Sequence, residues 1–198
     1  MNEREIRATF DDTTIRVYQA YSPHIALPAL DAGTFVSPFK MSRMTWIKPS
    51  FCWMMYRCGY GMKPGQEMVL GIDITREGFD WALRRAALST FTPSVHGNHE
   101  EWKKSLASAP VRVQWDPERN ANLEKIDGVR SIQMGLSADA VALYVHEWIT
   151  NIEDITPLAH SLHDPGSRSK RIFDLPTAAE RRYPIGPIPS IRLGELEG

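Results

Sequence analysis

A run of nine residues, EMVLGIDIT at positions 67–75, restricts the folds open to this chain more than any other segment. It is apolar almost without interruption, a pattern typical of a strand in the interior of a sheet. Thr75 then begins a helical pattern, REGFDWALRRAAL, whose apolar stripe extends to Ala86 or Ala87. The fold is therefore expected to contain a sheet with this segment at its centre.

Further strands and helices are expected on both sides of this segment. Alternating apolar residues predict strands at 14–21, 43–47, 111–115, 129–136 and 148–155. Capping residues, proline and glycine predict helices from Ser22 to Gly33, from Pro49 to Gly59, after Ser137 and after Thr156. Residues 90–109 are interpreted as a surface insertion with one short helix. Because strands and helices do not alternate strictly, we predict an α+β fold with a mixed or antiparallel sheet and flanking helices.

The length and the distribution of proline indicate one domain followed by a tail. A chain of 198 residues can bury one substantial core, which we assign to residues 1–164. Beyond this point the composition shifts to proline, glycine and charged residues. We predict that residues 165–198 form an extended tail that packs on the domain through the anchors Tyr183, Ile185, Ile188 and Ile191.

Charge, cysteine usage and hydropathy exclude several classes of protein. The formal net charge of -1 is not that of a protein that grips duplex nucleic acid along many phosphates. Cys52 and Cys58 are predicted to be reduced, buried thiols in one helix, and the scattered histidines predict no metal site. The first residues resemble no targeting signal, and no run of eighteen apolar residues occurs, so we expect a cytoplasmic protein without membrane contact.

The segment RMTWIKPSFCWMMYR, residues 43–57, is the strongest candidate for a site. A strand that ends near Lys48, followed by Ser50 at a helix start, would place free backbone N–H groups, the positive end of the helix dipole and an ammonium together. Such a point can bind an anion, Arg43 can add a second cation, and Trp46 lies on the same strand face as Lys48. The alternative is that the aromatic residues form core and that Lys48 extends to solvent.

Polar residues in three other strands complete the candidate set. Gln19 lies between Val17 and Tyr21 on one face of the strand at 14–21, so its amide needs partners, either structural or from a substrate. Gln133 lies between two apolar residues in the strand at 129–136. Asp116 and Pro117 are predicted to lead out of a strand into a turn, with Glu118 exposed at its tip.

The chain closely resembles an uncharacterised family, domain of unknown function 4291. The resemblance rests on IRVYQAYSPHIA, RMTWIKPSFCWMMYR, DITREGFDWAL, VRVQWDPERN and RSIQMGL with EWITNIEDIT, and it spans residues 4–160. A weaker resemblance is to the ADP-ribosyltransferase superfamily, in which VYQAYS, MTWIKPSF and SIQMGL follow in the corresponding order. This chain carries Gln19 where those enzymes have His or Arg, and Gln133 where they have a catalytic Glu.

This second resemblance implies a nucleotide-binding enzyme that transfers ADP-ribose from NAD to an acceptor, a protein or a nucleic acid. It implies Gln19, Tyr21, Arg43, Trp46, Lys48 and Ser50 as cofactor-binding residues and Glu118 and Gln133 as catalytic residues. Gln133 lacks the negative charge that favours a developing cation, so either Glu118 replaces that charge or the activity is altered or absent. The alternatives are a non-catalytic module for nucleotides or single-stranded nucleic acid, in which the same aromatic residues stack on bases, and a protein-interaction domain whose tail docks a partner.

Overall fold

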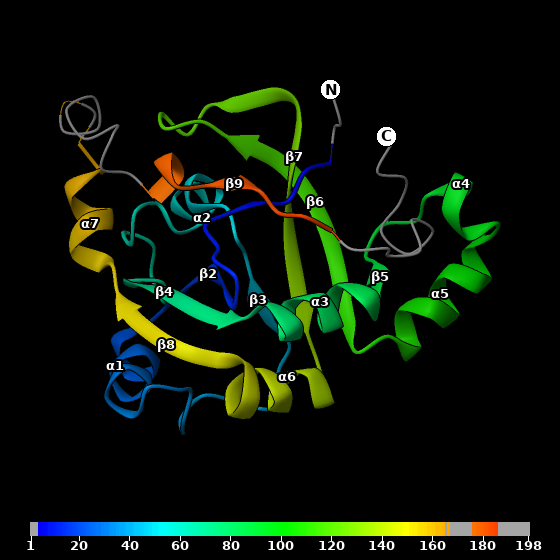
Figure 1. Ribbon diagram of the computed structural model, residues 1–198, viewed down its shortest axis with the longest axis horizontal. Helices are drawn as coiled ribbons and strands as arrows, with labels where there is room; N and C mark the ends of the chain where they lie inside the picture. The colour runs from blue at the N-terminus through cyan, green and yellow to red at the C-terminus, as the bar shows by residue number, and fades with distance from the viewer. Residues whose placement is uncertain (1–3, 165, 167–175, 186–198) are drawn as a thin grey trace.

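The computed structural model describes residues 4–164, 166 and 176–185, and it contains two main sheets (Figure 1). The first sheet consists of three antiparallel strands in the order β2-β4-β8, with bounds Thr14–Tyr21, Met68–Thr75 and Ile149–Asp154. β4 pairs with β2 on one side and with β8 on the other. The prediction that residues 67–75 form a central strand is therefore confirmed.

The second sheet has four strands in the order β3-β7-β6-β5. Their bounds are Thr45–Ile47, Lys125–Leu136, Val111–Arg119 and Ala86–Leu88. Only the pairing of β5 with β6 is parallel. An isolated bridge between Tyr18 and Lys48 connects the two sheets, and it fixes the chain where it leaves β3.

Helices cover the sheets and connect their strands, which confirms the α+β class. They are α1 (Pro23–Ala32), α2 (Phe51–Cys58), α3 (Arg76–Arg84), α4 (Pro93–His96), α5 (His99–Ser108), α6 (Asp139–Leu143) with the π-helical turn η1 (Tyr144–Trp148), α7 (Thr156–Ser161) and the short turn η2 (Pro176–Ala178). The main core lies between the sheets, since it combines Val17 and Ile72 with Val113 and Met134.

A second cluster lies on the other face of the three-stranded sheet, beneath α2. It joins Tyr18 and Val69 of this sheet to Phe51 and Met55 of the helix. Both faces of β4 are thus covered, which is the physical reason for its unbroken apolar sequence. Cys52 and Cys58 are free and buried in the same helix, as predicted.

Three local predictions are wrong. Ala86 and Ala87 belong to β5 instead of α3, because Val111 and Arg112 supply a strand partner for them. Residues 90–109 contain two helices, α4 and α5, instead of one. β6 continues through Pro117 to Arg119, where a turn was expected.

Proline is accommodated in β6 because Pro117 lies on an open edge. β5 pairs only with residues 111–113, so this part of β6 has a partner, β7, on one side alone. The register shifts between Pro117 and Arg119, which marks a bulge. Glu118 is consequently buried within the strand, with 4% of its surface exposed, and not at the tip of a turn.

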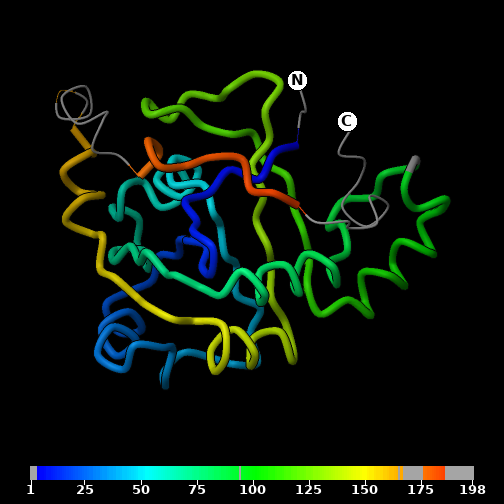
Figure 2. The backbone as a smooth tube through the Cα atoms, viewed as in Figure 1, coloured from blue at the N-terminus to red at the C-terminus, as the bar shows by residue number. Residues whose placement is uncertain are grey.

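The segment 176–185 lies beside the N-terminal segment of the chain, as Figure 2 shows. Its strand β9 (Arg181–Arg182) pairs with β1 (Arg7–Ala8). Tyr183 is buried and donates a hydrogen bond of 2.9 Å to the carboxylate of Asp80. Two of the predicted anchors, Ile188 and Ile191, lie outside the described residues. Among the residues that are described, no helix combines the length and the apolar character needed to cross a membrane.

Candidate functional site

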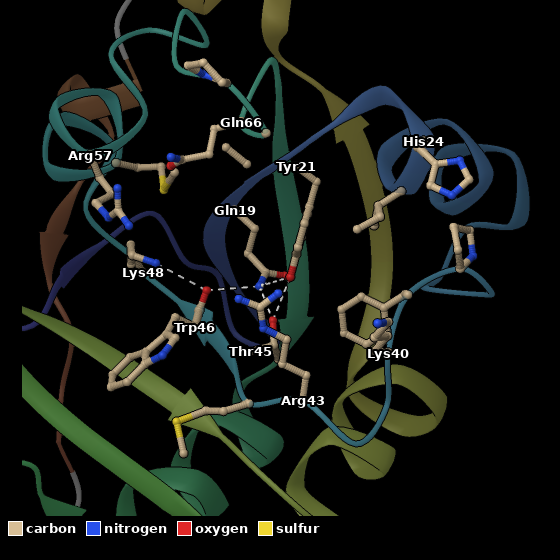
Figure 3. Close-up of a pocket in the computed structure, with 18 residues that line it drawn as sticks. Gln19, Tyr21, His24, Lys40, Arg43, Thr45, Trp46, Lys48, Arg57 and Gln66 are labelled. Carbon is tan, nitrogen blue, oxygen red and sulfur yellow. Dashed lines mark hydrogen bonds between the residues drawn. The ribbon is translucent and has the colours of Figure 1, made fainter.

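A cavity of about 540 Å³ opens where the two sheets meet (Figure 3). Its walls come from the end of β2, the start of α1, the loop before β3, β3 itself with Lys48 after it, α2 and the loop at 64–66. The lining residues are Gln19, Ala20, Tyr21, His24, Ile25, Pro38, Phe39, Lys40, Arg43, Met44, Thr45, Trp46, Lys48, Met54, Arg57, Pro64, Gly65 and Gln66. This volume is in the range of pockets that hold cofactors and other small ligands.

Five of the six residues predicted to bind a cofactor line this cavity: Gln19, Tyr21, Arg43, Trp46 and Lys48. The sixth, Ser50, lies outside the lining. Its hydroxyl accepts a hydrogen bond of 3.2 Å from the Trp53 backbone N–H and donates one of 2.7 Å to Glu118. Ser50 therefore caps α2, and the sequence pattern that placed a helix start here was correct.

The N-terminus of α2 is occupied by the protein's own groups. Besides the Ser50 cap, the Phe51 N–H donates a hydrogen bond of 2.8 Å to the Glu180 carboxylate. Burial raises the pKa of Glu180 to about 8, and the nearby Glu118 adds to this effect. The expectation that free N–H groups of this helix bind a ligand is wrong for Phe51 and Trp53.

The Gln19 amide is satisfied inside the protein. Its Nε2 lies 2.7 Å from the Thr45 hydroxyl, 3.0 Å from the Trp46 carbonyl and 3.0 Å from the Tyr21 hydroxyl. Its Oε1 accepts a hydrogen bond of 2.7 Å from Tyr144. Gln19 thus connects β2 to β3, and of its two possible roles the structural one accounts for all its polar atoms.

The hydroxyls of Tyr21 and Thr45 form a pair at this wall. They lie 2.7 Å apart, and either can donate to the other. Whichever donates, the hydrogen of the second hydroxyl has no acceptor among the hydrogen bonds of the described residues. Because both residues line the cavity, this hydrogen is available to an oxygen atom of a ligand.

Lys48 lies at the base of the cavity with 6% of its surface exposed. Its ammonium is 3.3 Å from the Trp46 carbonyl oxygen and 5.4 Å from the centre of the Trp53 ring. Burial lowers the pKa of Lys48 to about 7, and the positive charge of Arg57 lowers it further against a smaller opposite effect of Asp116. The backbone holds Lys48 in place, since its carbonyl accepts a hydrogen bond of 2.7 Å from the Tyr18 N–H.

The lining carries positive charge without a compensating acid. Lys40, Arg43, Lys48 and Arg57 all contribute to it, whereas no Asp or Glu does. In the part of the chain that the structure describes, none of these residues forms an ion pair with a carboxylate. Lys40, Arg43 and Arg57 are exposed, and Lys48 is buried below them. In a protein with a net charge of -1, this concentration of cations favours an anionic ligand.

The two residues predicted to be catalytic, Glu118 and Gln133, do not line the cavity. Glu118 accepts hydrogen bonds from Ser50 and from the backbone N–H of Arg119, and burial raises its pKa. Gln133 donates a hydrogen bond of 2.6 Å to Asp116 within the second sheet.

Sequence reasoning missed Lys40, Thr45, Arg57 and Gln66 in the lining. Arg57 gave a usable signal, because it is a polar position in a helix that is otherwise almost entirely apolar. The other three residues lie in loops or in a short strand, and their convergence depends on how the two sheets meet. Within the described ranges, no group of three or more His, Cys, Asp or Glu is arranged to hold a metal ion.

The fold and the cavity define an α+β protein with a cationic pocket between two sheets. The chain belongs to the family described as Domain of unknown function (DUF4291), whose sequence model matches residues 5–183. No curated protein matches the chain.

Proposed function

We propose that this protein binds a nucleotide in the cavity between its two sheets. The observation that carries the proposal is the lining of a cavity of about 540 Å³ by four lysine and arginine side chains, with no carboxylate among the lining residues. Lys40, Arg43 and Arg57 are exposed to an incoming phosphate. Phosphate groups are the common ligands that need several such cations at once.

Trp46 supports a nucleotide over a simple phosphate. Its indole lines the cavity and packs against Gly135, where a Cβ atom would lie 2.9 Å from the indole Cζ2. The absence of a side chain at Gly135 thus makes room for the ring. An indole held in this way offers an aromatic surface on which a base can stack.

NAD is the dinucleotide that we propose to test first, with ADP-ribosyl transfer to an unknown acceptor as the reaction. Trp46 would stack on a ring, and Arg43 and Lys48 would contact the pyrophosphate. Cleavage of the nicotinamide bond is favoured by a negative charge near the developing cation, and the cavity lining supplies none. The proposal of transfer therefore depends on nicotinamide release, which is measured separately from binding.

A module that binds single-stranded nucleic acid is the second candidate. One observation favours it: Tyr56 is 44% exposed, lies in α2 next to Arg57, and has the Arg119 guanidinium 3.7 Å from its ring centre. Tyr56 and Arg119 lie outside the cavity lining, so a single-stranded nucleic acid bound in the cavity could continue over them.

Calorimetric titration with NAD, AMP and a short single-stranded RNA tests both candidates. Saturable binding of NAD or AMP that weakens at least tenfold in Arg43→Ala and Arg57→Ala supports the nucleotide proposal. Lys104→Ala is the matched control, because Lys104 is exposed on α5 away from the cavity. RNA binding that falls steeply with salt and is lost in Tyr56→Ala would favour the second candidate instead. If neither nucleotide binds, the nucleotide proposal fails.

A further inference from the structure

The cavity separates one buried amine from several exposed cations. Lys40, Arg43 and Arg57 are exposed, whereas Lys48 is almost fully buried at the base. Figure 3 shows Lys48 pointing toward the carbonyl oxygen of Trp46, its one hydrogen-bond partner among the described residues. A ligand with one charged and one uncharged end would place its phosphate among the exposed cations and its uncharged end beside Lys48.

The surroundings of Lys48 leave its amine neutral in a large fraction of molecules at neutral pH. Burial lowers its pKa to about 7, and the charged groups that act on it are Arg57 from α2 and Asp116 from β6, with the Cys58 thiol as a weaker contributor. An ordinary exposed lysine has roughly one neutral amine in 2,500 at pH 7. A neutral amine has a lone pair, and desolvation of this kind is a common way to activate a lysine as a nucleophile.

We infer that Lys48 is a nucleophile that forms an imine with a phosphorylated aldehyde or ketone bound in the cavity. This inference rests on the proposed function, because the same exposed cations hold the phosphate. The lone pair of Lys48 Nζ attacks the carbonyl carbon, a C–N bond forms, and the carbonyl π electrons move to oxygen. The C–O bond of the resulting carbinolamine then breaks, and the oxygen leaves as water with the two hydrogens of the amine.

The neighbouring hydroxyls support this chemistry. The Trp46 carbonyl accepts hydrogen bonds from both Lys48 and Gln19, and Gln19 in turn contacts the hydroxyls of Thr45 and Tyr21. The amine and the hydroxyl pair therefore share one wall. The hydroxyl hydrogen that lacks an acceptor can be donated to the carbonyl oxygen, which makes its carbon more electrophilic and helps the oxygen to leave.

Pyridoxal 5′-phosphate with borohydride reduction is the direct test, because reduction converts an imine into a stable amine that peptide mass mapping locates. We expect one dominant adduct on Lys48 of the unaltered protein, formed at least tenfold faster than on Lys104. The labelling rate should be half-maximal near pH 7, and AMP should compete. Pyridoxal without phosphate should label Lys48 at least tenfold more slowly.

Lys48→Arg and Lys104→Arg are the paired variants. The first should lose the dominant adduct, and the second should be labelled like the unaltered protein. The inference is overturned if labelling is spread evenly over surface lysines, or if Lys48 stays unmodified while AMP still binds. That last result leaves the proposed nucleotide function standing. Absence of AMP binding, with Lys48 labelled equally by pyridoxal and its phosphate, would refute the proposed function and its phosphate site instead.

Discussion

Replacing Lys48 by methionine should stabilise the protein at neutral pH, and this gain should shrink as the pH rises. The folded structure lowers the pKa of Lys48 from 10.5 to about 7 because the buried ammonium loses its hydration. The unfolded chain therefore binds more protons than the folded protein between these two values. Burial of this amine therefore lowers the free energy of unfolding by its full amount below pH 7. This penalty disappears as the pH approaches 10.5, the pKa of the lysine in the unfolded chain.

The size of the effect follows from proton linkage. A difference of one pKa unit corresponds to about 1.4 kcal/mol, so these two pKa values give a change of about 2 kcal/mol between pH 7 and pH 9. The free energy of unfolding of the unaltered protein should rise by this amount relative to Lys48→Met. Methionine is a suitable replacement, because it has a similar length and no charge to bury.

Urea denaturation of both proteins at pH 7, 8 and 9 provides the measurement. Other groups titrate in this range as well, but they are shared by the two proteins and cancel in the difference. Lys104→Met serves as the control, since Lys104 is exposed and its removal should give a difference that does not vary with pH. A stability difference between Lys48→Met and the unaltered protein that is constant across this range would refute the reasoning.

Three further substitutions test the hydrogen bonds of Gln19, the contact of Gly135 with the Trp46 ring, and the buried carboxylate of Glu118. Gln19→Leu should lower the free energy of unfolding by about 1–3 kcal/mol in chemical denaturation, because it leaves the buried Tyr144 hydroxyl without its acceptor. Gly135→Ala should weaken nucleotide binding in calorimetry, because the new methyl group would lie 2.9 Å from Trp46; unchanged affinity would contradict the stacking role. Glu118→Gln should raise the melting temperature at neutral pH. Burial raises the pKa of the Glu118 carboxyl, so the stability that it gives the folded protein is lost as the pH rises through that pKa and the group ionises, whereas glutamine carries no charge to bury. The same variant should keep its nucleotide affinity, and a large loss of affinity would indicate that Glu118 takes part in nucleotide binding.

Much of the fold could be predicted from local patterns. The strand at 14–21 was predicted with the bounds that the structure gives it, and the helix between Ser50 and Gly59 follows its capping residues. Such elements are specified by residues that are close in sequence, namely alternation, a cap and a glycine with positive φ. The errors arose where a distant partner decided the outcome: Ala86 and Ala87 join β6, and Pro117 is tolerated because β6 has an open edge there.

The candidate site divides in the same way. The sequence by itself determined that Trp46 and Lys48 project toward one face, because side chains in a strand alternate, and it placed Arg43 nearby as a second cation. Only the tertiary structure decided that Arg57 and Lys40 join them, that Glu118 is buried outside the lining, and that the Gln19 amide is satisfied by Tyr144. The physical reason is that charge, burial and hydrogen-bond partners at this site depend on how two sheets meet, and no local pattern in the chain encodes that contact.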